Sequence, residues 1–526
     1  MRENKVLVGL LFVGLCLRVI GLDAVPPALN SDELLKAFDG ASVYLTGRDH
    51  HNQPWPLFFE QSGEYSPPLY IYFSGLFSAP FGVNAYTVRL PSALLGTLSI
   101  LLTYLFTAEF AGRRIGLLAA ALVVFSPWNL HYSRIGWEAI LQPPLQLAGL
   151  WLFLVWIRTK TFLPLAISAL VFGSTFYAYP ASRVFIPLLL LGLCAIYYKE
   201  LRAELRHTLA AFLLFILVLL PYLFYLFRHY EAMQARWKFL SIFEQGNGWN
   251  LFFIDYLLHL SPNFLFFTGD PNPLHRMGSG LALSALFPFF LIGILRLGRD
   301  RLRAGYVLGW WFFLFAVPSA LTNDRYDLYS MPNALRSVCG MNLIEIVSAY
   351  GLYYFLSESL SSVTSEKQRR IAAVSVAVLI AVNMVWVGYN YAVRYPLRAA
   401  AAWQYGLRKV IQFTEANQDR FDRIVFSPKV RLHPVSLAYF SGRKPGPFQG
   451  ADFPKYVIPF ITYVPIYQDF GMSVFTRYSG ISQWYYQAPG RNWLVTLPNE
   501  ITGETPLKEF KNPDGGIAYR IFSTNR

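Results

Sequence analysis

Charged residues are scarce in this sequence. Lys, Arg, Asp and Glu make up 14% of its 526 residues, whereas 54% belong to the hydrophobic set and the mean hydropathy is +0.35. A water-soluble chain of this composition would need an implausibly large dry core, so the ordinary soluble classes are excluded. Repeated apolar runs of about 17 to 25 residues match a hydrocarbon layer ~30 Å thick and predict membrane-crossing helices.

Cysteine is also scarce, and acidic residues are outnumbered by basic ones. Cys16, Cys194 and Cys339 lie in or beside apolar segments without paired spacing, which excludes a disulfide framework and a cysteine metal site. The 45 Lys and Arg against 31 Asp and Glu give a net charge of +14. Because membrane proteins collect Lys and Arg in cytoplasmic connectors, this charge requires no nucleic-acid partner, and none is expected.

The apolar runs predict about eleven membrane-spanning helices. The predicted spans are residues 5–22, 88–110, 115–131, 139–157, 162–180, 184–198, 208–227, 281–297, 304–322, 337–356 and 371–393. The basic clusters in their short connectors all fall on one face, which places the N-terminus in the cytoplasm by the positive-inside rule. The first run has no small-residue cleavage site, so we expect it to remain as the first span.

A second region begins where the hydropathy falls, at about Arg394. Residues 423–426, 493–496 and 517–522 read as short strands between Pro and Gly turns, which predicts a small α/β domain over residues 394–526. An odd number of spans places this domain outside, in the periplasm or extracellular space. The predicted fold is therefore a mostly α polytopic membrane protein, residues 1–393, followed by an extracytoplasmic α/β domain.

Two long connectors on the outer face, residues 23–87 and 228–280, are the expected places for function. The first contains Ser31-Asp32-Glu33, where Ser31 is a candidate cap for a helix with both acids in its first turn. Helix capping explains the two carboxylates structurally, whereas their position at the predicted membrane surface favours a functional role. The sequence leaves both interpretations open.

Other features of the outer loops are less specific. Pro67-Pro68 predicts a turn and the start of the next helix. Arg89 lies at the mouth of the second span, where an arginine commonly reaches lipid phosphates. Glu138 in the next outer loop is another carboxylate at that depth. His50-His51 matches no metal motif, and we expect these histidines to be solvated in a loop.

In their order along the chain, these features resemble the GT-C superfamily of membrane glycosyltransferases. The resemblance rests on Asp32-Glu33, the proline-marked return, the run from Arg89 to Gly96 and the acid Glu138. It is strongest before residue 200 and is closest to the protein O-mannosyltransferases and the lipid A aminoarabinose transferases (glycosyltransferase family 39-like). Residues 179–183, 269–276 and 332–336 look like stretches of bacterial members. The inserted lumenal domain of the O-mannosyltransferases is missing.

The resemblance implies inverting transfer of a sugar from a polyprenyl phosphate to a lipid, glycan or protein acceptor, outside a bacterial inner or plasma membrane. It implies that Asp32 is the general base, with Glu33 as orienter or alternative base and Glu138 as a second acid. Guanidinium groups bind phosphate through forked bonds. The implied donor-phosphate ligands are Arg183, Arg276 and Arg336, followed by Arg89 and Arg134. The implied substrate-binding residues are Glu64, Tyr65, Asp270 and His275. Membrane lipids are further partners; no cofactor is required, and no motif supports the divalent metal that some relatives use.

Two other classes share part of this pattern. A transporter or flippase of lipid-linked sugars would be expected to show internal repeats and acids at mid-membrane, whereas the acids here cluster in outer loops. An O-antigen-ligase-like or polymerase enzyme would share the long outer loop and the arginines. Such an enzyme has no need for the early pair Asp32-Glu33.

Overall fold

The computed structural model describes residues 2–61, 64–245, 248–322, 331–359, 365–430, 432–448, 452–453, 455–457, 490–501 and 504–525. The chain divides into two compact units. Unit 1 comprises residues 1–22, 92–230 and 237–395, and unit 2 comprises residues 23–91, 231–236 and 396–526. The segment 23–91, from the first predicted outer loop, therefore groups with the C-terminal region.

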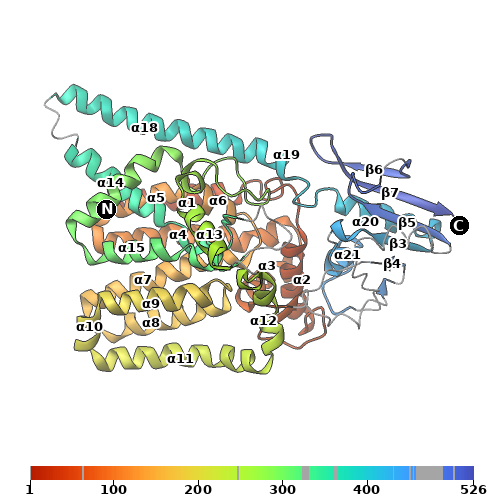
Figure 1. Ribbon diagram of the computed structural model, residues 1–526, viewed down its shortest axis with the longest axis horizontal. Helices are drawn as coiled ribbons and strands as arrows, with labels where there is room; N and C mark the ends of the chain where they lie inside the picture. Colours follow the sequence, from red (N-terminus) through yellow and green to blue (C-terminus); the bar gives the residue numbers. More distant parts are fainter. Residues whose placement is uncertain are drawn as a thin grey trace. The chain divides into compact units, whose positions relative to one another are not determined.

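Unit 1 is built from helices (Figure 1). Within it, α14 packs on α17, and α8 packs on both α7 and α11. The second predicted outer connector contains two helices, α12 and α13. The helices of unit 1 and its borders are α1 (Arg2–Val19), α4 (Ala85–Ala111), α5 (Arg113–Val124), α6 (Pro127–Tyr132), η1 (Glu138–Leu141), α7 (Gln142–Thr159), α8 (Phe162–Ser174), α9 (Ser182–Ile196), α10 (Tyr198–Ala203), α11 (Leu205–Arg228), α12 (Tyr230–Leu240), α13 (Gly248–Leu260), α14 (Phe287–Asp300), α15 (Arg303–Leu314), α16 (Val317–Ala320), α17 (Leu343–Tyr354), α18 (Glu366–Tyr389) and α19 (Tyr395–Ala399).

Membrane crossing is supported by length and composition for four helical stretches of the described chain: Ala85–Ala111, Glu138–Thr159, Leu205–Arg228 and Glu366–Ala399. Phe162–Tyr177 and Ser182–Ile196 are apolar but shorter. The predicted total of about eleven spans is therefore not established. Some apolar runs are divided between two helices, since α5 ends at Val124 and α15 at Leu314 while the apolar residues continue into the short helices α6 and α16. Phe212 on α11 and Val382 on α18 are among many exposed apolar side chains on these two helices, as expected for contact with lipid.

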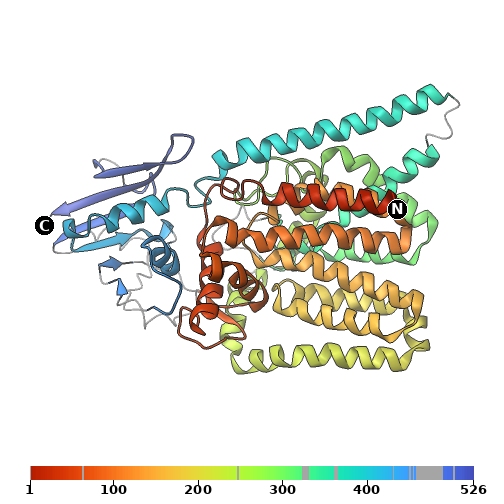
Figure 2. The ribbon, with the colours of Figure 1, turned by 180° about the vertical axis from the view of Figure 1, so that it is seen from behind.

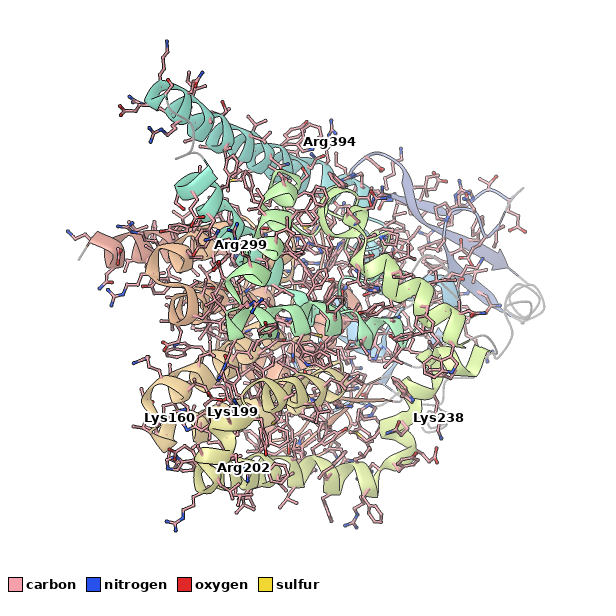
Figure 3. The ribbon with its side chains drawn as sticks, turned by 60° about the vertical axis from the view of Figure 1, so that its left-hand side comes forward. Lys160, Lys199, Arg202, Lys238, Arg299 and Arg394 are labelled. Carbon is pink, nitrogen blue, oxygen red and sulfur yellow. The ribbon has the colours of Figure 1, made fainter. Side chains whose placement is uncertain are left out.

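Basic side chains gather at one end of unit 1. Figure 3 shows Lys160, Lys199 and Arg202 near one another, by the connectors that join α7 to α11. Arg303, which begins α15, forms an ion pair with Glu200 on α10 at the same end. The N-terminus also lies at this end in the views of Figures 1 and 2. A single basic end is the arrangement on which the predicted cytoplasmic N-terminus depends.

Unit 2 contains a five-stranded sheet with the order β4-β3-β5-β7-β6. Strand β3 is parallel to β4 and β5, and β7 is antiparallel to β5 and β6. The predicted strands at residues 423–426, 493–496 and 517–522 are confirmed as β3, β5 and β7. The elements are β3 (Arg423–Phe426), β4 (Tyr456–Val457), β5 (Arg491–Thr496), β6 (Lys508–Lys511), β7 (Ile517–Asn525), α20 (Leu407–Glu415) and α21 (Pro434–Phe440).

The first outer segment completes unit 2 with α2 (Ser31–Thr46), the hairpin β1 (Phe59–Gln61) and β2 (Glu64–Ser66), and α3 (Pro68–Phe81). Leu35 and Phe38 of α2 belong to the same buried core as Ile424 and Ile521 of the sheet. Burial of these side chains fixes α2 against the C-terminal region. Helix α3 starts directly after Pro67, as the double proline predicts.

Candidate active site

Helix α2 carries the early acidic pair. Its N-cap is Asn30 rather than Ser31, because the Asn30 side chain accepts a hydrogen bond from the Glu33 N–H at 2.9 Å. Glu33 Oε2 in turn accepts from the Asn30 N–H at 3.3 Å, which completes a capping box. Ser31 instead donates its N–H and its hydroxyl to Gln404 Oε1, at 3.0 and 2.9 Å. The expected helix is present, and its first turn is fixed by the capping box and by the hydrogen bonds from Ser31 to Gln404.

Glu33 is fully occupied by a second interaction. Arg89 Nε lies 2.8 Å from Glu33 Oε1, and Arg89 Nη2 lies 2.8 Å from Glu33 Oε2, with both side chains 0% exposed. The guanidinium also donates to the carbonyl oxygens of Pro26 and Ala28. It lies 5.6 Å from the ring centroid of Trp403. The structure thus places Arg89 inside unit 2 as the partner of Glu33.

Asp32 is the exposed member of the acidic pair. In the part of the chain that the structure describes, its carboxylate has no hydrogen bond or ion pair. Its backbone is held by the capped first turn of α2, while its carbonyl accepts from Lys36 Nζ at 3.5 Å. A rigid backbone with an accessible carboxylate is the arrangement that a general base requires.

Asp39, two turns further along α2, forms a buried pair with His50. His50 Nδ1 lies 2.5 Å from Asp39 Oδ1, the His50 N–H donates to the same oxygen at 3.1 Å, and Gln61 Nε2 donates to Asp39 Oδ2 at 2.9 Å. His50 is only 2% exposed, so the expectation of a solvated loop histidine was wrong. The error arose because the loop after α2 folds back over Asp39, which periodicity does not reveal.

This pair perturbs several ionisations. Burial opposes the charged imidazolium, but the Asp39 charge and hydrogen bond outweigh it and raise the pKa of His50. Burial likewise opposes the carboxylate, but His50 and Gln61 outweigh it and lower the pKa of Asp39. Burial, followed by the charge of Asp39, raises the pKa of Asp49 to about 6.

Two neighbouring histidines are held neutral. The His51 ring centroid lies 4.0 Å from that of His50, and His433 Nδ1 caps α21 by accepting from the Val435 N–H at 3.1 Å. Burial, reinforced by the charge of His50, lowers the pKa of His51 and of His433 to about 3. Among the residues that the structure describes, no three His, Cys, Asp or Glu side chains are grouped to hold a metal ion.

The hairpin supplies the two implied substrate-binding residues of unit 2. Glu64 and Tyr65 form part of β2, paired with Gln61 and Glu60 of β1. The side chain of Glu64 lies outside the described part of the chain. Tyr65 is half-buried.

In unit 1, Arg134 caps the C-terminal end of α1. Its guanidinium donates to the carbonyl oxygens of Leu17, Ile20 and Gly21, at 2.8 Å each, and it is 4% exposed. These carbonyls lie in the last turn of α1 or directly after it, where orphan acceptors need donors. Glu138 starts η1 and is half-buried.

Asp270 and His275 form a second buried pair. His275 Nδ1 lies 2.9 Å from Asp270 Oδ2, and Asp270 Oδ1 accepts from the Asn272 N–H at 2.7 Å. The turn is closed by the Arg276 N–H, which donates to the Asn272 carbonyl at 2.9 Å, and the Arg276 side chain is exposed. The implied substrate residues Asp270 and His275 and the implied phosphate ligand Arg276 therefore share one fixed turn.

The other two implied phosphate ligands differ in setting. Arg183, half-buried at the start of α9, has its guanidinium carbon 4.9 Å from the ring centroid of Tyr222. Arg336, also half-buried, follows a turn formed by Asn333 and donates from Nη1 to the Thr322 carbonyl at 3.2 Å. All three implied ligands belong to unit 1, whereas Asp32 belongs to unit 2.

Sequence reasoning missed some buried polar residues. Arg18 on α1 is 0% exposed and bonds to Asn129 Oδ1 at 2.6 Å and to the Val123 carbonyl at 3.2 Å. Asp255 and His259, one turn apart on α13, are 1% and 0% exposed. An arginine inside the first apolar run and an Asp-x-x-x-His spacing were the signals that could have pointed to them.

Comparison with known proteins shows what this chain is similar to. Residues 65–225 match the family model described as dolichyl-phosphate-mannose-protein mannosyltransferase. A search of the curated proteins found no match. The fold is that of the GT-C superfamily, so the resemblance read from the sequence is confirmed.

Particular solved structures are similar over most of their length. ArnT from Cupriavidus metallidurans in the apo state has a TM-score of 0.61 at 11% identity, covering 99% of this chain and 98% of that chain. ArnT bound to undecaprenyl phosphate gives 0.59 at 11% identity, covering 98% and 97%. The archaeal oligosaccharyltransferase AglB from Archaeoglobus fulgidus, in complex with an inhibitory peptide and a dolichol-phosphate, gives 0.50 at 14% identity, covering 85% and 64%.

Proposed function

We propose that this chain is an inverting membrane glycosyltransferase that moves a sugar from a polyprenyl monophosphate to an acceptor on the external face of a bacterial inner or plasma membrane. The similar ArnT and AglB structures contain undecaprenyl phosphate and dolichol-phosphate, which supports a lipid-phosphate donor. The observation that carries the proposal is the difference in environment between Asp32 and Glu33. Glu33 is neutralised by Arg89, and Asp32 is exposed beside it on a capped helix.

In the proposed reaction, an acceptor hydroxyl or amine attacks the anomeric carbon from the face opposite the phosphate. The new bond forms as the bond from the anomeric carbon to the phosphate oxygen breaks, so the configuration inverts. Asp32 takes the acceptor proton, and the polyprenyl phosphate leaves with the electron pair. Holding the reactants in line supplies much of the rate enhancement, since the phosphate is already a fair leaving group.

Cationic side chains would stabilise the phosphate as negative charge develops on it. We assign this role to Arg183, Arg276 and Arg336. In this proposal Arg89 and Arg134 instead maintain structure, because their guanidinium groups are bonded to Glu33 and to backbone carbonyls. In this proposal side chains of this chain remove the acceptor proton and stabilise the phosphate. Glu138 helps to shape the part of the site that binds the acceptor.

The class of activity can be tested with purified protein in lipid vesicles. The vesicles are given polyprenyl-phosphate sugars and an extract of envelope lipids, glycans and proteins. We expect a glycosylated product and free polyprenyl phosphate, at a rate unchanged by a chelator. Passage of the donor across the vesicle membrane without any product would contradict the proposal and favour a flippase.

A further inference from the structure

Residues 332–336 form a short irregular segment whose backbone amides are bonded to two buried Asp–His pairs. The Asn333 N–H donates to His259 Nε2 at 3.0 Å, and the Ala334 N–H donates to Asp270 Oδ2 at 2.6 Å. His259 and Asp270 are 0% and 1% exposed. They come from α13 and from the loop after η4 (Asn263–Phe267), so two separate parts of unit 1 hold adjacent amides.

The carbonyl oxygens of the same segment are held by two aromatic side chains. Trp128 Nε1 donates to the Ala334 carbonyl at 3.2 Å, and the Tyr179 hydroxyl donates to the Leu335 carbonyl at 3.2 Å. Trp128 lies on α6, and Tyr179 lies between α8 and α9. Aromatic rings lose little conformational entropy when they are fixed, so these donors are rigid.

The segment also closes on itself just before an arginine. Asn333 Oδ1 accepts from the N–H groups of Leu335 and Arg336, at 3.0 Å each. These two hydrogen bonds fix the backbone of Arg336 relative to Asn333, so that it moves only together with the segment. The Arg336 side chain remains half-buried rather than enclosed.

The contacts of His259, in the pair with Asp255, are compatible with one tautomer of its imidazole only. His259 Nε2 faces a backbone N–H and must therefore present its lone pair. The proton then lies on Nδ1, which is 2.8 Å from the Asp255 carbonyl and 3.1 Å from its carboxylate. The backbone carbonyl of Asp255 accepts the hydrogen bond from Nδ1 and so orients His259 as an acceptor for the segment.

The second pair connects two of the assigned phosphate ligands. Asp270 Oδ2 is shared by His275 Nδ1 and the Ala334 N–H, while Oδ1 fixes the turn that ends at Arg276. A single carboxylate therefore sets the Arg276 turn and the Arg336 segment relative to each other. Two arginines carried on segments that are fixed relative to each other suit a ligand with several anionic oxygens.

We propose that His259, Asp270, Trp128 and Tyr179, here called the clamp, are positioning residues that place Arg336 for the phosphate of a lipid monophosphate. The inference rests on the proposed function for the identity of the ligand, and it adds a role for buried groups that touch no substrate. A charged group that must lie within about 0.5 Å of its productive position needs surrounding residues that fix it there. The clamp acts through Arg336, so its effect must disappear when Arg336 is removed.

The test measures binding of undecaprenyl monophosphate alone, without sugar or acceptor, to the full chain in nanodiscs. Arg336→Ala is expected to weaken binding about tenfold or more, the value of a charge-assisted bond. Tyr179→Phe, which keeps the ring and removes one donor, is expected to weaken it about three- to tenfold. His259→Leu is expected to weaken binding similarly, whereas His259→Gln, which retains an acceptor, is expected to bind within about twofold of the unmodified protein.

The decisive comparison repeats Tyr179→Phe and His259→Leu in the Arg336→Ala background, where no further loss is expected. Phosphate-free polyprenol serves as the control ligand and should bind all variants alike. An unchanged affinity in Arg336→Ala, or a clamp effect that persists without Arg336, would overturn the inference. If His259→Leu does not fold, Tyr179→Phe carries the test. Failure of the proposed function would appear separately, as phosphate binding that depends on the clamp without any sugar transfer.

Discussion

Glu33 and Arg89 meet in a forked ion pair with both nitrogen–oxygen distances at 2.8 Å and no exposed surface on either side chain. The pair joins the first turn of α2 to the start of α4. It also decides which carboxylate of the acidic pair remains free for chemistry. The proposed role of Asp32 as the general base depends on this ion pair.

Breaking this ion pair should destabilise the protein strongly. Arg89→Met leaves the Glu33 carboxylate buried without a partner, which is expected to cost about 3–5 kcal/mol. The double variant Glu33→Gln/Arg89→Met removes both charges and is expected to recover part of that loss. Thermal unfolding in detergent measures both effects. A melting temperature of Arg89→Met equal to that of the unmodified protein would show that the pair contributes nothing.

Local patterns predicted the parts of this fold that depend on neighbouring residues. The strands β3, β5 and β7 and the start of α3 followed from residue type and turn chemistry. The helix with Asp32 and Glu33 in its first turn was also predicted, although its cap is Asn30 rather than Ser31. Two adjacent residues with capping side chains cannot be told apart without the backbone dihedral angles.

Contacts between side chains that are far apart along the chain could not be predicted from the sequence. Arg134 was interpreted as a phosphate ligand, but it bonds carbonyls more than a hundred positions earlier in the chain. His50 was interpreted as solvated because its partner Asp39 lies on a different element. The packing of Leu35 against the C-terminal sheet is another tertiary contact with no local signal.

The Asp39–His50 pair predicts a pH-dependent stability. Because the pKa of His50 is raised, its contribution is complete below the ordinary value of 6.5 and is lost as the pH rises through the raised value. Because the pKa of Asp39 is lowered, its contribution is present above 3.8 and is lost as the pH falls through the lowered value. The loss caused by His50→Gln should therefore be largest between these limits, at about 1.5–3 kcal/mol.

Unfolding of the unmodified protein and His50→Gln, measured in parallel from pH 4 to 9, tests this prediction. Asp49, Glu60, His51 and His433 also interact with His50, so His50→Gln changes their titration too and the comparison reports the pH dependence of the whole group. The difference in melting temperature should shrink toward pH 9. A difference that grows with pH would contradict the direction of the His50 shift.

Replacing Asp49 should have an effect on stability of the opposite sign to that of replacing His50. Its pKa of about 6 in the folded state exceeds the ordinary 3.8, so ionisation above pH 6 opposes folding. Asp49→Asn can still accept the hydrogen bond from the Gln53 N–H and should stabilise the protein by roughly 1–3 kcal/mol at pH 8. Little effect is expected at pH 4. Destabilisation at pH 8 would show that the charged form is favoured.

The crossing of α2 and α3 should tolerate no side chain at Gly40. A Cβ atom there would lie 2.2 Å from the Ile71 carbonyl oxygen and 2.8 Å from the Gly75 nitrogen, both backbone atoms that cannot move aside. Gly40→Ala is therefore expected to destabilise the protein by about 1–3 kcal/mol or more. Gly9→Ala, at a helical position with no atom within 4 Å, is the matched control and should have no such cost. Equal melting temperatures for the two variants would contradict the close crossing.

The role of Asp32 as the general base is tested by the rate of sugar transfer by Asp32→Asn, measured together with its affinity for polyprenyl monophosphate. Asp23→Asn, which alters another exposed carboxylate of the same outer segment, is the control. We expect Asp32→Asn to lose about 10²–10⁴-fold in transfer rate while phosphate affinity and folding are retained. Transfer at the unmodified rate by Asp32→Asn would show that Asp32 is not the general base.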